Sequence, residues 1–493
     1  MSRTTQRLSQ LTLCYEAEEV FESAESALPG PTLVVKVDVD DGDDVVKHLN
    51  DMEADGGGLT GLAANHVSGP TQDFTYQCPP RFYLQHQEKR YSRPSSRLDL
   101  NMASDTRTIK STCLCGAVGF DITLPSSAFP LKSLFCHCES CRRVTGSLCL
   151  TVAMLPDDYR PPQDHVATLH SYAFSDRLTQ YSCSTCGTLA LQKFYKTGKD
   201  DPPKWTICTG SLEFADGIFE LAAHEFIGDT IDGGFSDFLP SVNGKQINRW
   251  IRGPGDGEQL PLYWQLPSRP KPDPKQSDRL HVHCKCSGVS FYIARPSART
   301  ALKKPLLPED RFSSESEANK HLETSAWWLR EGGSRYLARA CSCDSCRLAT
   351  GQEWVVWSFV PMIEMSLDKE GHQPFTLDTG TLKHYRSSDV ATRHFCGECG
   401  ATVFWEGDER PHILDVAVGL LDAPEGARAE SWVWWETDFV SFREDGMPRA
   451  KALTEALESG LAAFGKHQRD GSESLLTLDN LRLNDEKLGS SSK

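Results

Sequence analysis

The stretch Cys136–Cys141, with the sequence CHCESC, places three cysteines at C-x-C-x-x-C spacing and recurs as Cys341–Cys346, with the sequence CSCDSC. The residues that follow also match, because Arg142–Gly146 parallels Arg347–Gly351. Matched stretches at a wide separation indicate an internal repeat. The chain therefore holds two copies of one cysteine-rich domain.

Shorter cysteine pairs flank each triplet in the same order. A C-x-C pair precedes the triplet, and a C-x-x-C-G pair follows it. The flanking cysteines are Cys113, Cys115, Cys183 and Cys186 in the first copy, and Cys284, Cys286, Cys396 and Cys399 in the second. Each copy thus has seven cysteines in three clusters, and the repeat predicts that both copies fold alike.

The repeat and the composition divide the chain into five segments. These are an N-terminal extension at 1–107, a first domain at 108–250, a Pro-rich linker at 251–279, a second domain at 280–447 and a tail at 448–493. The extension has acidic and glycine runs, so we expect it to be largely disordered. The tail is expected to be helical and then disordered.

Local patterns predict a mainly β fold with a short helical C-terminal tail. Ile109–Leu124 alternates between apolar and polar residues, which is typical of a half-buried strand. The apolar run Trp354–Met362 suits a buried strand, and Thr32–Val39 reads as a strand in the extension. Helical apolar spacing appears at Lys451–Phe464.

Charge and hydropathy exclude several classes of partner. The formal net charge of −16 repels phosphate backbones and anionic lipid, which disfavours nucleic acid as a partner. No apolar run reaches the roughly 20 residues that span a bilayer, so we expect no membrane association. The first residues show no apolar signal region. We therefore expect a cytoplasmic protein, with a nuclear location left open.

Clustered cysteines in a reducing compartment favour metal over disulfides. Structural zinc sites are closed by four ligands, whereas catalytic sites keep an open position. Seven cysteines divide naturally into four plus three, and two short pairs make a four-thiolate site as in a zinc ribbon. We therefore predict two zinc ions per domain, about four per chain. The glycine after each C-x-x-C pair can turn left-handed and aim amides at the sulfurs.

The three-ligand sites consist of Cys136, Cys138 and Cys141 in the first copy and Cys341, Cys343 and Cys346 in the second. No nearby fourth ligand occurs in both copies: Cys149 corresponds to Trp354, and His137 to Ser342. One interpretation is an exchangeable fourth position that suits an incoming thiol. The other is a structural site closed by a distant residue. The ligand count leaves both open.

The order C-x-C, C-x-C-x-x-C-R and C-x-x-C-G, followed by a Gly-x-Leu strand, resembles the glutathione-dependent formaldehyde-activating domain shared with centromere protein V, the CENP-V/GFA domain. The resemblance covers roughly 108–245 and 280–445. It implies a mostly β fold with one structural and one catalysis-linked zinc per domain. In the second copy Cys286-Ser287-Gly288 replaces Cys115-Gly116, which puts the local turn in doubt.

The resemblance also implies a function. We expect a zinc-dependent carbon–sulfur lyase-type enzyme that acts on a small thiol adduct, such as one of glutathione and an aldehyde. The six triplet cysteines would be catalytic. The alternative is a non-catalytic zinc module for protein–protein interaction, because a fold does not settle function. We expect the two domains to pack on each other.

Other residues have simpler interpretations. Arg142, Arg143 and Arg347 either neutralise thiolate charge, remain solvated, or bind a substrate carboxylate. Cys208 is expected to be an inert core residue. Further expectations are core or inter-domain contacts for Trp432, Trp434 and Trp435, and ordinary hydrogen-bonded roles for His224 and His412.

Overall fold

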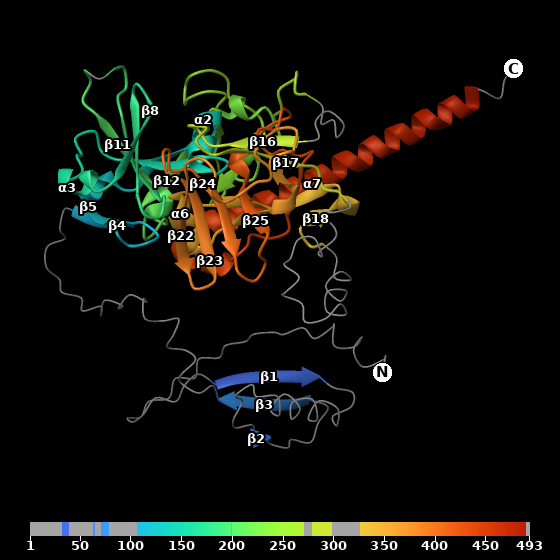
Figure 1. Ribbon diagram of the computed structural model, residues 1–493, viewed down its shortest axis with the longest axis horizontal. Coiled ribbons are helices and arrows are strands. Elements are labelled where there is room, and N and C mark those ends of the chain that lie inside the picture. The colour runs from blue at the N-terminus through green and yellow to red at the C-terminus, as the bar shows by residue number, and fades with distance from the viewer. Residues whose placement is uncertain are drawn as a thin grey trace. The chain divides into compact units, whose positions relative to one another are not determined.

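In the computed structural model, the described residues are 106–198, 200–270, 279–297 and 326–489, together with three earlier strands (Figure 1). Contacts divide the chain into the units Met1–Met102 and Ala103–Lys493. The N-terminal unit contains an antiparallel sheet in the order β1 (Thr32–Asp38), β3 (Thr71–Gln77) and β2 (Ala63–Ala64). The strand predicted at Thr32–Val39 is confirmed as β1. The expected disorder falls on residues outside the described ones.

The first copy is built on an eight-stranded sheet. Its order is β15 (Asn248–Arg249), β12 (Phe219–Glu225), β6 (Leu131–Cys136), β7 (Leu150–Met154), β11 (Lys204–Cys208), β10 (Leu189–Phe194), β9 (Leu178–Ser182) and β8 (His170–Ser175). Two separate hairpins are β4 (Thr106–Thr112) with β5 (Gly119–Pro125), and β13 (Ser241–Val242) with β14 (Lys245–Gln246).

The second copy repeats this plan. Its large sheet has the order β18 (Leu329–Arg330), β19 (Arg335–Cys341), β20 (Val355–Pro361), β25 (Ile413–Ala417), β24 (Thr402–Gly407), β23 (Ala391–Cys396) and β22 (Leu382–Ser388), and β26 (Val433–Trp435) pairs with β19. A smaller sheet contains β16 (Arg279–His283), β17 (Ser290–Ala294) and β21 (Met365–Ser366). The first cysteine of each triplet ends a strand that has a parallel neighbour, because β6 pairs with β12 and β19 pairs with β26.

Two strand predictions have different outcomes. The apolar run Trp354–Met362 contains β20, which is buried at every position, as predicted. The pattern at Ile109–Leu124 is not one strand but the hairpin of β4 and β5. The chain reverses because the amide of Cys113 donates to the carbonyl of Val118 at 2.8 Å across a tight turn. The alternation of apolar and polar residues continues on both sides of that turn, so the sequence pattern does not reveal the turn.

Short helices lie between the strands, and the long segment α7 follows them, with a break in helical geometry at Ala450. The α-helices are α2 (Glu139–Thr145), α3 (Gln163–Ala167), α6 (Asp344–Thr350) and α7 (Arg443–Gly489). The 3-10 helices are η2 (Ser126–Ala128), η3 (Thr209–Ser211), η4 (Ile227–Thr230), η5 (Gly234–Asp237), η8 (Glu331–Gly333), η9 (Met362–Glu364) and η10 (Val418–Leu420). The helix predicted at Lys451–Phe464 lies within α7, where it buries Leu453, Leu457, Leu461 and Phe464. Among the described residues, no helix is both long and apolar enough to cross a membrane.

Reciprocal hydrogen bonds join the two copies. The amide of Gly210 donates to the carbonyl of Gly351 at 3.0 Å, and the amide of Gly419 donates to that of Gly146, also at 3.0 Å. Gly210 and Gly419 occupy equivalent positions of the repeat, as do Gly351 and Gly146. The copies therefore present the same surface to each other, as two subunits do about a two-fold axis.

Helix α7 contributes a buried ion pair to this contact. Arg449 pairs with Glu353 at 2.7 Å, and both side chains are almost fully buried. Arg449 also donates to the carbonyls of Thr209 and Leu212 in the first copy. Since a buried charge is costly unless it is paired and hydrogen-bonded, this arrangement fixes the start of α7 against both copies.

Candidate metal centres

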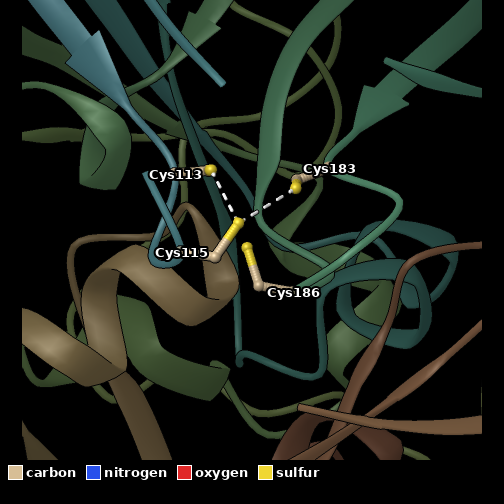
Figure 2. Close-up of side chains that lie close together, drawn as sticks. All are labelled: Cys113, Cys115, Cys183 and Cys186. Carbon is tan, nitrogen blue, oxygen red and sulfur yellow. Dashed lines mark hydrogen bonds between the residues drawn. The ribbon is translucent and has the colours of Figure 1, made fainter. Parts of the chain in front are cut away.

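The four flanking cysteines of the first copy converge on one point (Figure 2). Cys113 and Cys115 lie in the turn between β4 and β5, and Cys183 and Cys186 lie between β9 and β10. The sulfur of Cys115 is 3.4 Å from that of Cys113 and 3.6 Å from that of Cys183. Zinc–sulfur bonds of about 2.3 Å place tetrahedral thiolates about 3.8 Å apart. The four sulfurs therefore fit a zinc ion, and the described cysteines are all free thiols.

The second copy forms the same cluster from Cys284, Cys286, Cys396 and Cys399. The sulfur of Cys286 lies 3.5 Å from those of Cys284 and Cys396. Ser287 adopts the left-handed φ of 59° where the first copy has Gly116 at 75°, so the turn that the sequence put in doubt keeps its geometry.

Backbone amides point at the cluster sulfurs, as expected. The amides of Val118 and Val289 donate to Cys113 and Cys284 at 3.2 and 3.4 Å. The glycines that follow the C-x-x-C pairs, Gly187 and Gly400, have φ values of 81° and 78°. These donors stabilise thiolate charge, which suits the cluster to a cation.

Each triplet lies where a strand meets a short helix. Cys136 ends β6 and Cys341 ends β19. The next cysteine caps the helix: the sulfur of Cys138 accepts the amide of Cys141 at 3.3 Å, and the sulfur of Cys343 accepts that of Cys346 at 3.3 Å. The three sulfurs of each triplet lie within 4.8 Å of one another. The spacing therefore brings three soft ligands to one point, which fits zinc.

The structure adds no protein ligand to either triplet. Among the described residues, no further Cys, His, Asp or Glu donor atom lies within 4.8 Å of all three sulfurs in either copy. His137 instead hydrogen-bonds His224 at 2.9 Å, and Cys149 is buried in the core. Each triplet thus presents three thiols, one ligand fewer than a closed zinc site.

Hydrogen bonds within each triplet favour a thiolate. Those of Cys138 with Cys136 and then Cys141 lower the pKa of Cys138 to about 3. In the second triplet, hydrogen bonds with Cys341 and Cys343, together with the charge of Arg393, hold the pKa of Cys346 well below its usual range. Each triplet therefore favours a thiolate, as metal binding requires.

Sequence reasoning missed the acidic residues beside the first triplet. Glu225 ends β12, and burial together with the Cys138 thiolate raises its pKa to about 7. Asp229 also has a raised pKa, from burial and then from the same thiolate. A short signal exists, because Phe226 and Asp229 recur as Phe442 and Asp445, and both phenylalanines have left-handed φ values of 56° and 57°. Two matched residues are too few for the sequence alone to identify this segment as part of the site.

All three arginines are buried and donate to backbone carbonyls, which the sequence did not predict. The charge of Arg142 also lowers the pKa of Cys138, in line with the predicted neutralisation of thiolate charge. Arg142 donates to the carbonyl of His137, Arg143 to that of Leu420, and Arg347 to those of Gly210 and Leu212. Arg143 and Arg347 therefore join each triplet helix to the other copy.

The remaining candidates are structural. His224 is buried, and its Nε2 bonds the carbonyl of Leu239 at 2.8 Å. Cys208 is fully buried in β11. Trp435 lies 4.9 Å from Phe238 of the first copy between ring centroids, as expected for an inter-domain contact.

A fifth group of possible ligands is His281, His283 and Asp422. Arg143 pairs with Asp422 at 2.7 Å. Hydrogen bonding from His283 lowers the pKa of Asp422 to about 2, although burial opposes this shift. The group adjoins a cavity of about 320 Å³ whose lining includes His281 and Asp422 but no triplet cysteine. We assign it to the ionic contact between the copies.

Purified protein should contain about four zinc ions per chain, because four cysteine clusters present three or four thiols each. Elemental analysis alongside thiol counting checks this. Two or fewer ions with all fourteen clustered thiols intact would contradict the four-plus-three division.

A family model described as glutathione-dependent formaldehyde-activating enzyme matches 108–228 and 330–437. The second match begins after Cys284 and Cys286, which the structure nevertheless brings to Cys396 and Cys399. No curated protein and no solved structure matches the chain. With the repeated clusters and the mainly β fold, the match shows that the chain belongs to the GFA family and carries its domain twice in tandem.

Proposed function

We propose that the protein is a zinc-dependent carbon–sulfur lyase-type enzyme that acts on an adduct of a small thiol, such as glutathione, and an aldehyde. The observation that carries this proposal is the three-thiol triplet without a fourth donor among the described residues. The family description, which names glutathione and formaldehyde, supports the substrate class.

Cys136, Cys138 and Cys141 would hold the metal in the first copy, and Cys341, Cys343 and Cys346 would hold it in the second. A zinc ion bound there would lower the pKa of a coordinated thiol and present it as a thiolate. In the adduct-forming direction, the thiol sulfur forms a bond to the aldehyde carbon, and the carbonyl oxygen takes up the proton that the thiol lost. The lyase direction reverses these steps, and neither direction needs an oxidant.

The residues around the first triplet suit this chemistry. Glu225 pairs in register with Cys136 and has a raised pKa of about 7, and we assign it the proton from an incoming thiol. Leu150, Val152 and Leu189 pack with Cys136 and Cys141, and Phe226 packs against the same cluster. Apolar walls exclude water and strengthen charge interactions at the sulfur. A reducing compartment such as the cytoplasm, where we place the protein, keeps these thiols free.

Glutathione should change the sulfur-to-metal absorption of the cobalt-substituted protein. Binding should also release a proton, because the metal takes the thiolate form. Calorimetric titration in two buffers of different ionisation enthalpy would measure that proton. The control is the double variant Cys141→Ser, Cys346→Ser, which should lose both responses.

If metal-loaded protein shows neither response at millimolar glutathione, the lyase proposal fails. A non-catalytic zinc module for protein–protein interaction then takes its place.

A further inference from the structure

The two triplets are alike in their sulfurs but differ in the strands beside them. Counting three positions back from the C-x-x-C pair gives Gln180 on β9 in the first copy and Arg393 on β23 in the second. The residues that pair with these two positions on the neighbouring strands also differ. Gln180 pairs in register with Gln192, whereas Arg393 pairs with Trp405. The first copy thus has a pair of uncharged side-chain amides where the second copy has an arginine beside its metal ligands.

Arg393 provides the second triplet with a counter-charge. Its Nη1 and Nη2 lie 3.6 and 3.5 Å from the sulfur of Cys346, and the residue is only 4% exposed. An arginine stays charged in proteins. Three thiolates around one Zn²⁺ carry a net charge of −1, which the guanidinium cancels. The guanidinium also occupies the space beside the sulfur of Cys346, where an external ligand would have to lie.

Gln180 leaves this place in the first copy uncharged, and the cation that acts on the first triplet is Arg142, from the triplet's own helix. The residue is 1% exposed, and among the described residues its amide nitrogen and oxygen both lack a hydrogen-bond partner. A buried polar group without a partner is destabilising, so native proteins rarely keep one unless something else satisfies it. Because Gln180 takes the place of Arg393 in the repeat, a ligand at the first triplet would supply the missing partner.

The coverage of the triplets differs in the same direction. Cys138 is partly exposed, whereas Cys343 is buried. The hydroxyl of Ser342 donates to the carbonyl of Phe442 at 2.9 Å, and the amide of Asp344 donates to Asp445 at 3.3 Å. Helix α7 begins at Arg443, within this covering segment. The backbone of Glu139 makes the equivalent contact with Asp229 in the first copy, so the exposure of the middle cysteine is what distinguishes the two sites.

One carboxylate of the first site, that of Glu225, has no counterpart in the second. Ser441 stands where the first copy has Glu225, as the shared pairing partners show: Glu225 faces Cys136, and Ser441 faces Cys341. The second triplet thus has Arg393 against one of its sulfurs, a buried middle cysteine and no acidic neighbour at this position. The first has an unsatisfied amide in the equivalent place, a partly exposed middle cysteine and an acid.

We propose that the two copies have divergent roles: the first triplet exchanges an external thiol, whereas the second binds zinc but takes no external thiol. Gln180 determines this difference by donating its amide to the ligand of the first site, and Arg393 by occupying the equivalent space in the second. This inference rests on the proposed function, because it assigns thiol binding to one of the two sites.

The test is the number of glutathione molecules bound per chain, measured by calorimetry on the metal-loaded full-length protein and by absorption of its cobalt form. We expect one per chain. The matched variants separate the two sites: Cys346→Ser should keep that binding, and Cys141→Ser should lose it. Gln180→Leu should bind about tenfold more weakly, the effect of one hydrogen bond to a charged group, while retaining four metal ions.

Two equivalent glutathione molecules per chain would overturn the divergence but leave the proposed function intact. Binding that survives Cys141→Ser and disappears with Cys346→Ser would also overturn it. If Gln180→Leu binds glutathione as tightly as the wild type, the Gln180 amide does not donate to the ligand. No binding by the wild-type protein would refute the proposed function itself.

Discussion

Replacing Cys399 with Ser should unfold the protein at physiological temperature and release zinc. Cys399 is 1% exposed, and its sulfur completes the four-cysteine cluster of the second copy. Structural zinc binding is coupled to folding and is worth about 10–16 kcal/mol in small zinc domains. Domain stabilities are only about 5–15 kcal/mol, so losing this site exceeds the margin. Cys186→Ser should have the same effect through the first copy.

The damage should spread between the copies. The reciprocal bonds of Gly210 with Gly351 and of Gly419 with Gly146 disappear when either copy unfolds. Circular dichroism melts with parallel zinc analysis would therefore show a single early transition. Cys149→Ala is the matched control: this cysteine is buried but outside every cluster, and removing its sulfur should cost only about 1–2 kcal/mol. Similar melting of Cys399→Ser and Cys149→Ala would contradict a structural metal site.

The cysteine clusters could be predicted because metal chemistry restricts both the residue type and the spacing. Zinc requires thiolates from two short turns, and the turns at Cys113–Cys115 and Cys183–Cys186 are local features of the sequence. The repeat then provided an independent check, because every cluster occurs twice. The four-plus-three division follows from counting ligands, and the structure groups the cysteines in the same way.

What lies around the triplets could not be predicted, because it comes from distant strands. Arg393 reaches Cys346 from 47 positions away, and Arg143 reaches Leu420 from 277 positions away. No periodicity in the sequence reports such contacts, which depend on how the strands are ordered in the sheet. The hairpin at Ile109–Leu124 was missed for a local reason, since a pattern of period two continues through its turn.

Gly351→Ala and Gly146→Ala should each separate the copies or unfold them. Gly351 has a φ of 71°, and an added Cβ would lie 1.9 Å from the carbonyl oxygen of Leu189 in the other copy. Gly146 is its counterpart, with a φ of 79° and a Cβ position 2.1 Å from the carbonyl oxygen of Thr402. Both obstacles are backbone atoms, which cannot rotate aside as a side chain can.

The expected loss is about 4 kcal/mol or more for each variant, because a steric clash adds to the roughly 1–2 kcal/mol cost of a left-handed alanine. Gly244→Ala separates these two terms. Gly244 has a similar φ of 74° but nothing within 4 Å of an added Cβ, so only the conformational cost applies. Denaturant unfolding should therefore place Gly244→Ala close to the wild type and the other two far below it. Equal losses for all three would mean that the copies can move apart at Gly146 and Gly351 without cost, and that their reciprocal contact does not hold the two zinc domains together.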